Sequence, residues 1–171
     1  MNRRNTLIMA LLCLTVALPA GDAAGQQKTL KDQLVGAWLY VSSEFVAPNG
    51  AKQPSPFGAN PKGITIFDAS GRYVDVEMRP DRPKFKGSPN YRETASAEVW
   101  GEAAKGFAAN FGTWSVDEAS KTLIQHWDGA LFPNNEGRET KSSIILTGDE
   151  LKLVGTSPAG STDTDVYRRA K

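Results

Sequence analysis

The chain of 171 residues contains a single histidine, and this residue is the first candidate for chemistry. His126 lies in the segment 122–131, directly before Trp127. An imidazole titrates near neutral pH, so it can act as a general base or form a hydrogen bond with a carboxylate, carbonyl or hydroxyl group of a ligand. It can equally be a core residue bonded to a neighbouring strand. The residue type alone leaves these three roles open.

Acidic residues spaced two apart are the second candidates. Asp75 and Glu77 share one face of a strand-like segment, and Glu44 can join them. Two carboxylates at this spacing can bind a metal or form an acid–base pair. More often they form the solvated face of an outer strand, which is the interpretation that we prefer here.

Other catalytic and metal-binding patterns are missing from the sequence. With one cysteine and one histidine, the chain is not expected to form a structural zinc site, which uses four Cys or His ligands. It contains no Gly-x-Ser-x-Gly nucleophile elbow and no Walker-type phosphate loop. We therefore predict no catalytic residue, no metal site and no cofactor.

Short strand-like segments, separated by turns, must carry the candidate residues. Eight are expected, at 36–45, 63–68, 72–78, 112–116, 122–131, 138–147, 151–156 and 164–170. Such a meander of sequential strands closes most readily into an up-and-down antiparallel barrel, because closure removes the exposed edges of the sheet. The predicted fold class is all-β.

Two segments interrupt the strands. The segment 93–111 is rich in alanine and places apolar residues at helical spacing, which predicts one amphipathic helix between the third and fourth strands. The segment 80–92 combines proline, glycine and charged residues, and it predicts a long loop. A helical turn at 30–36 is expected to lead into the first strand.

The N-terminal residues have the order of a secretory signal peptide. Arg3 and Arg4 precede an apolar stretch at 6–19, and small residues follow it. The apolar stretch is shorter than the roughly 20 residues of a membrane-spanning helix. Leu12 precedes Cys13 where a lipid-anchor signal requires a small residue, so no membrane anchor is expected. We predict a signal peptide at 1–25 and a mature domain at 26–171 that is periplasmic or secreted.

Charge and cysteine content limit the partners of the mature domain. The chain has 20 Lys and Arg against 19 Asp and Glu, and loss of Arg3, Arg4 and Asp22 makes the two counts equal. A formally neutral protein is not expected to bind nucleic acid or an anionic membrane surface. The only cysteine would leave with the signal peptide, so burial of apolar residues must stabilise the fold without disulfides.

The order of several motifs resembles the bacterial lipocalin-like domain family, a relative of the calycins. The motifs are LVGAWLYVSSEF at 34–45, GFAANFGTWSVD at 106–117, IQHW at 124–127, LFPNNEGRE at 131–139, LTGDELKL at 146–153 and YRR at 167–169. The resemblance covers about residues 30–170. Trp114 and Tyr167 depart from the residues common in the family, but both keep an aromatic ring, so the fold is not in doubt.

This resemblance implies an eight-stranded barrel around a cavity for a small lipophilic or amphipathic molecule. A barrel of this size is either filled by side chains or able to hold one small ligand. The resemblance also implies that Trp38 points inward and closes one end of the barrel. Arg169, on the last strand, would then lie across the Trp38 ring in a cation–π contact.

The resemblance, together with strand alternation, suggests five ligand-binding residues: His126, Tyr40, Trp100, Phe107 and Glu44. Tyr40 and Glu44 share a face of the first strand with Trp38. Trp100 and Phe107, on the expected helix, would close over one end of the cavity. His126 would point into the barrel, and Trp127 would lie on the opposite face of its strand.

Three functional classes are compatible with these features. The predicted one is an exported protein that carries or sequesters a small lipophilic or amphipathic molecule. The alternative is an isomerase or cyclase that acts on a lipid-like or polyketide-like substrate in the same cavity. The third is a structural or interaction protein with a filled barrel. An apolar pocket with a few convergent polar groups would support the first two classes, and a solid core would support the third.

Overall fold

The computed structural model describes residues 28–85 and 90–171. The predicted signal peptide, residues 1–25, lies outside the described residues. In the described part of the chain, no helix is long and apolar enough to cross a membrane.

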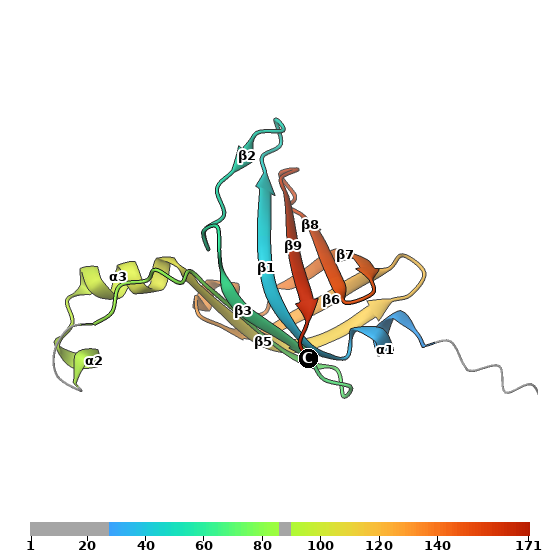
Figure 1. Ribbon diagram of the computed structural model, residues 1–171, viewed down its shortest axis with the longest axis horizontal. Helices are drawn as coiled ribbons and strands as arrows, with labels where there is room; N and C mark the ends of the chain where they lie inside the picture. Colours follow the sequence, from blue (N-terminus) through green and yellow to red (C-terminus); the bar gives the residue numbers. More distant parts are fainter. Residues whose placement is uncertain (1–27, 86–89) are drawn as a thin grey trace, which may run out of the picture.

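Antiparallel strands form one sheet that closes on itself (Figure 1). The sheet order is β2-β1-β3-β4-β5-β6-β7-β8-β9, and β1 also pairs with β9. The strands are β1 Gly36–Val46, β2 Lys52–Gln53, β3 Lys62–Phe67, β4 Arg72–Met78, β5 Phe107–Asp117, β6 Thr122–Ala130, β7 Glu139–Thr147, β8 Glu150–Thr156 and β9 Thr162–Arg169. The two-residue strand β2 pairs only with the end of β1, so eight long strands make the barrel. The predicted all-β, up-and-down antiparallel barrel is confirmed.

The helices differ from the prediction. Two helices, α2 (Tyr91–Thr94) and α3 (Ala97–Lys105), replace the single helix expected over 93–111, and α2 begins within the expected loop at 80–92. Both helices lie after β4, so the predicted position between strands three and four is not matched. The short strand β2, which was not predicted, raises the number of strands before the helices to four. Figure 1 shows them projecting from one side of the barrel, opposite α1 (Leu30–Leu34).

The end of α3 explains why the helical pattern was misleading. Ser96 caps the first turn of α3, and Gly106 ends the helix. The residues that follow form β5, in which Phe107 pairs with Met78 and Phe111 pairs with Val74 of β4. Pairing with a neighbouring strand here overrides the intrinsic helix preference of the alanines.

One end of the barrel is closed by α1 and Trp38. The backbone amides of Leu30 and Lys31 each donate a hydrogen bond of 2.9 Å to the carboxylate of Glu118, which ties α1 to the turn after β5. Trp38 is fully buried, and its indole nitrogen donates to the carbonyl oxygen of Leu34 at 2.8 Å. The guanidinium carbon of Arg169 lies 4.1 Å from the centre of the Trp38 ring. The contact implied by the family resemblance is therefore present.

The apolar core fills the half of the barrel next to α1. Its buried side chains include Leu34, Trp38, Phe67, Trp114, Leu123 and Leu151. The Phe67 and Trp114 rings pack with their centres 4.8 Å apart. These residues lie near the strand ends that face α1. The apolar core therefore does not fill the interior at the opposite strand ends.

Candidate functional site

A cavity of about 600 Å³ occupies the half of the barrel away from α1. This volume is in the range of about 300–1,000 Å³ that is typical of small-molecule sites. Strands from β3 to β9 contribute to its walls, together with the residues that connect β8 to β9. The barrel is thus filled by side chains at one end and open at the other.

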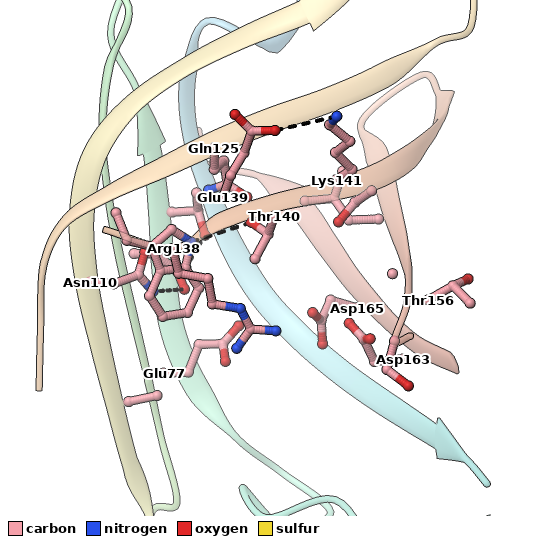
Figure 2. Close-up of a pocket in the computed structure, with 18 of the residues that line it drawn as sticks. Glu77, Asn110, Gln125, Arg138, Glu139, Thr140, Lys141, Thr156, Asp163 and Asp165 are labelled. Carbon is pink, nitrogen blue, oxygen red and sulfur yellow. Dashed lines mark hydrogen bonds and ion pairs between the residues drawn. The ribbon is translucent and has the colours of Figure 1, made fainter. Parts of the chain in front are cut away.

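The walls of the cavity are far more polar than the sequence suggested. The sequence suggested an apolar pocket with a few convergent polar groups, and the structure instead lines the cavity with five carboxyl side chains. Four of them lie on two strands, Asp75 and Glu77 on β4 and Asp163 and Asp165 on β9, and the fifth is Glu139 on β7. Figure 2 shows Glu77 approaching from one wall, and Asp163 and Asp165 from another, toward the same space.

Glu77 is almost completely buried, with 7% of its surface exposed. The hydroxyl group of Tyr167 donates a hydrogen bond of 3.1 Å to its Oε1 atom. Burial raises the pKa of Glu77, and the carboxyl groups of Asp75 and Asp165 raise it further. Tyr167 is also buried, and burial raises the pKa of its hydroxyl group, so this group stays a neutral donor.

Asp75 is held by a chain of polar side chains across β3, β4 and β5. The hydroxyl group of Thr65 donates a short hydrogen bond to Asp75, and the amide of Asn110 donates another at 3.3 Å. The Tyr73 hydroxyl donates to the amide oxygen of Asn110 at 2.7 Å. The bonds to Asp75 favour its charged form, but burial outweighs them and raises its pKa.

Asp165 and Asp163 extend this acidic surface on β9. The Tyr40 hydroxyl donates to Asp165 at 3.2 Å, and burial, followed by the nearby Asp163, raises the pKa of Asp165 to about 7. Asp163 lies over Gly155 of β8, where a Cβ atom would come within 2.6 Å of its carboxylate. A side chain at position 155 would therefore push Asp163 out of place.

Two basic residues, Arg138 and Lys141, also line the cavity, and each contacts another residue of the lining. Lys141 pairs with Glu139 at 3.3 Å. The guanidinium carbon of the exposed Arg138 lies 5.6 Å from the centre of the Trp127 ring. Among the described residues, no Lys, Arg or His forms an ion pair with any of the four carboxyls on β4 and β9. The wall formed by β4 and β9 thus has no ion-paired carboxyl, although Arg138 and Lys141 lie elsewhere on the lining of the same cavity.

His126 does not point into the cavity, so the expected orientation is wrong. Half of its side-chain surface is exposed, and its Nε2 atom lies 3.8 Å from the carboxylate of Asp128 on the same outer face. Leu123, on the opposite face of β6, is fully buried, and Trp127 on that face lines the cavity. Because both faces of this strand mix polar and apolar residues, alternation alone did not say which one faces inward.

The other four candidate residues also lie outside the cavity lining. Tyr40 is buried in the core, where its ring packs against that of Tyr167 and its hydroxyl group donates to Asp165. Glu44 is exposed and pairs with Lys52 of β2 at 2.7 Å. Trp100 lies on α3 and is 40% exposed, and its ring centre is 4.8 Å from that of Phe85. Phe107 belongs to β5 and not to a helix, and the Arg82 guanidinium lies over its ring. Trp100 and Phe107 therefore do not cover the cavity as expected.

The carboxyls that do line the cavity were misread or missed in the sequence. The sequence pattern favours a solvated outer face for Asp75 and Glu77, and it does not single out the two aspartates of β9. A signal was available in both strands. Tyr73, Asp75 and Glu77 are spaced two residues apart, so they share one face of β4. Asp163, Asp165 and Tyr167 have the same spacing on β9. A buried aromatic ring at the end of each series would have placed the whole series inside the barrel.

The arrangement can accept protons and hydrogen bonds from a ligand at several separate points. In the described part of the chain, no three His, Cys, Asp or Glu side chains come together closely enough to hold a metal ion. The cavity is therefore suited to an organic molecule with polar donors.

Comparison with known proteins agrees with this architecture. The family model of the lipocalin-like domain matches residues 35–166. No curated protein matches the chain.

Three solved structures illustrate the likeness. One is a redesigned beta barrel (12% identity, 82% of this chain and 95% of that chain covered, TM-score 0.41). Another is a de novo designed fluorescence-activating beta barrel (11% identity, 81% and 95% covered, TM-score 0.39). The third is a mutant of the fluorescent protein UnaG (16% identity, 81% and 96% covered, TM-score 0.37).

Proposed function

This chain belongs to the lipocalin-like domain family, and we propose that it is an exported protein that binds a small amphipathic molecule in the open half of its barrel. The observation that carries the proposal is the cavity of about 600 Å³, which side chains leave open while the other half of the barrel is tightly filled. The proposal of export rests on the charged, apolar and small-residue order of residues 1–25.

The walls favour an amphipathic ligand over a purely lipophilic one. Glu77, Asp163 and Asp165 offer hydrogen-bond acceptors, whereas Trp127 and Leu153 offer apolar surface in the same cavity. Moving a wholly apolar molecule against buried carboxyl groups would remove water from them without replacing its hydrogen bonds, which is unfavourable. A molecule with one polar and one apolar part can satisfy both kinds of wall.

Two neighbouring serines of β7 provide a matched test of where the ligand binds. Ser142 lines the cavity, whereas Ser143 is exposed on the opposite face of the strand. Ser142→Trp should fill the cavity, and Ser143→Trp should add the same bulk outside it. We expect protein purified from its native host to carry a small molecule, detectable by native mass spectrometry. That molecule should be lost in Ser142→Trp and kept in Ser143→Trp.

Either of two results would contradict the proposal. One is a wild-type protein that carries no small molecule and takes none up from host extract. The other is equal retention by the two tryptophan variants, which would place the binding site outside the barrel.

The alternative, an isomerase or cyclase, is favoured by one specific observation. Asp165 has a pKa of about 7 and faces the cavity, so it is suited to give or take a proton near neutral pH. If the recovered molecule is converted by the wild-type protein, and Asp165→Asn still binds it but stops the conversion, the enzymatic function replaces simple binding.

A further inference from the structure

We infer that the ligand is an organic cation, and that its protonated amine binds between Glu77 on β4 and the two aspartates of β9, Asp163 and Asp165. This inference rests on the proposed function, because it names the chemical class of molecule bound in the same cavity. It is carried by the charge balance of the cavity, by unpartnered oxygen atoms on its wall, and by the spacing of the carboxyl groups.

The charge balance of the cavity is the first observation. The Tyr167–Glu77 hydrogen bond connects β9 to β4 past the intervening strands β1 and β3, so the carboxyls of the two strands face one space. Within the described residues, none of these carboxyls has a basic partner at ion-pair distance. Buried carboxyl groups in proteins are normally either paired with a cation or kept neutral by a proton. A positively charged ligand would supply the missing partner.

Unpartnered oxygen atoms on the wall are the second observation. Glu77 is more than nine-tenths buried and lines the cavity, and only its Oε1 atom accepts a hydrogen bond, from Tyr167. The Oε2 atom has no donor among the described residues, and neither oxygen of Asp163 has one. These oxygens line the open cavity and are not among the fully buried atoms that lack a partner, so a donor on a bound ligand can reach them. An ammonium group presents three N–H donors and no acceptor, which matches this surface.

The spacing of the carboxyls distinguishes an organic cation from a metal ion. The acidic side chains do not converge on one point, since no metal-holding cluster is found among the described residues. A metal ion needs several ligands within about 2.0–2.6 Å of one centre. An amine on a carbon skeleton can instead donate to separate acceptors, while the skeleton packs against Trp127 and Leu153 on the apolar part of the wall.

Proton exchange gives the inference a measurable signature. Burial raises the pKa values of Glu77 and Asp165, so Glu77 and a large fraction of Asp165 hold a proton near neutral pH when no cation is present. A bound ammonium group favours the charged carboxylates and releases those protons. The groups that share this equilibrium are Asp75 on its own strand, Asp163, Asp165 and Tyr167 on β9, and Tyr40 on β1. The basic residue Arg138 lines the same cavity.

The test uses three probes that share one indole body and differ only in the end group. Tryptamine carries an ammonium group, tryptophol a hydroxyl group and indole-3-acetate a carboxylate. Their binding to the mature protein is measured by titration calorimetry at pH 7 in two buffers of different ionisation enthalpy. We expect tryptamine to bind about tenfold or more tightly than tryptophol, because a hydrogen bond to a charged group is stronger than a neutral one. Its binding should release protons.

Variants identify the acidic wall as the cause. Glu77→Gln and Asp165→Asn should reduce tryptamine affinity about tenfold or more and reduce the release of protons, while leaving tryptophol affinity nearly unchanged. The control is Glu150→Gln, which removes an exposed carboxylate that pairs with Lys152 on β8. This control makes the same change of charge and should alter neither measurement. Circular dichroism of each variant checks that the barrel is intact.

The outcomes separate the inference from the proposed function. If tryptophol or indole-3-acetate binds as well as tryptamine, and Ser142→Trp blocks that binding, the cavity is a ligand site but the cation inference is wrong. An equal loss of affinity for all three probes in Glu77→Gln would also overturn the inference. The Glu77 side chain would then affect only the shape of the cavity and not the recognition of charge. If none of the probes binds, the inference fails, and the ligand recovered from the native host still decides the proposed function.

Discussion

The carboxyl groups of the cavity should make the protein less stable as pH rises, and Asp165→Asn tests this most cleanly. Asparagine has the shape of aspartate, and its amide oxygen can still accept the hydrogen bond from Tyr40. The folded protein holds the proton of Asp165 up to a pKa of about 7, against an ordinary value of 3.8. Between these two values the folded state binds more protons than the unfolded state, so the free energy of unfolding falls as pH rises.

The size of the effect follows from the same shift. Each pKa unit corresponds to about 1.36 kcal/mol, so the wild type should lose up to ~4 kcal/mol through Asp165 between pH values of about 4 and 8. The variant lacks this loss. Removal of the Asp165 charge also lowers the pKa of Glu77, which adds to the difference in the same direction. Asp165→Asn should therefore be clearly more stable than the wild type at pH 8 and nearly equal to it at pH 4.

Urea unfolding followed by tryptophan fluorescence, at a series of pH values, measures this difference directly. Glu150→Gln serves as the control, since its exposed carboxylate should leave the profile unchanged. The reasoning is refuted if the difference between Asp165→Asn and wild type does not change with pH, or if the variant is the less stable protein at pH 8. Either result would mean that Asp165 is charged and well compensated in the folded protein.

Three further predictions concern the closed end, the histidine and the N-terminus. Trp38→Ala should destabilise by about 3–5 kcal/mol in denaturant titrations, since Trp38 is fully buried, and Arg169→Ala should cost less. The two effects should couple in a double-mutant cycle because the guanidinium lies over the ring, and additive effects would show that the contact contributes nothing. His126→Ala should change stability by no more than about 0.5 kcal/mol and leave tryptamine binding intact, and a clear loss of binding would return His126 to the site. Mass spectrometry of protein from its native host should find a mature N-terminus at Ala24 or Gln26, and an intact Met1 in the soluble mature form would rule out cleavage.

Strand alternation, turns and the motif order were sufficient to predict the barrel. Each of the eight expected segments overlaps a long strand, and α1 lies where a helical turn was expected. The sequence also indicated Trp38 and Arg169 as partners, since the family resemblance placed them at the same end. The helix predicted from local sequence preference was wrong for residues 107–111, because these residues pair with β4 and form a strand. Only the fold as a whole brings that partner strand into reach.

The site was harder to predict because alternation gives two faces without saying which is buried. On β6 the choice depended on Leu123, which is in the core, and the expected inward position of His126 was on the other face. On β4 the usual preference of carboxylates for water suggested an outer face, and the structure shows the opposite for Glu77. Residues that break such a general rule are often the functional ones, since their burial is unfavourable without a binding role.

A bulge between β5 and β6 adds a further detail that no single-strand pattern contains. The register shifts between Phe111 and Gly112, and Asp128 is the extra residue on the β6 side. A side chain at Gly112 would overlap the carbonyl oxygen of His126, so the bulge depends on glycine at this position. Asp128 then lies within 2.5 Å of the Arg72 guanidinium on the outer face. His126 and Asp128 thus lie together on the outer face of β6.

The most direct test of the central claim is a high-resolution crystal structure of the protein purified from its native host without added ligand. We predict electron density for a small molecule in the open half of the barrel, with a nitrogen atom within hydrogen-bond distance of Glu77 and Asp165. A cavity that holds only ordered water, or one closed by inward movement of the wall, would contradict the account.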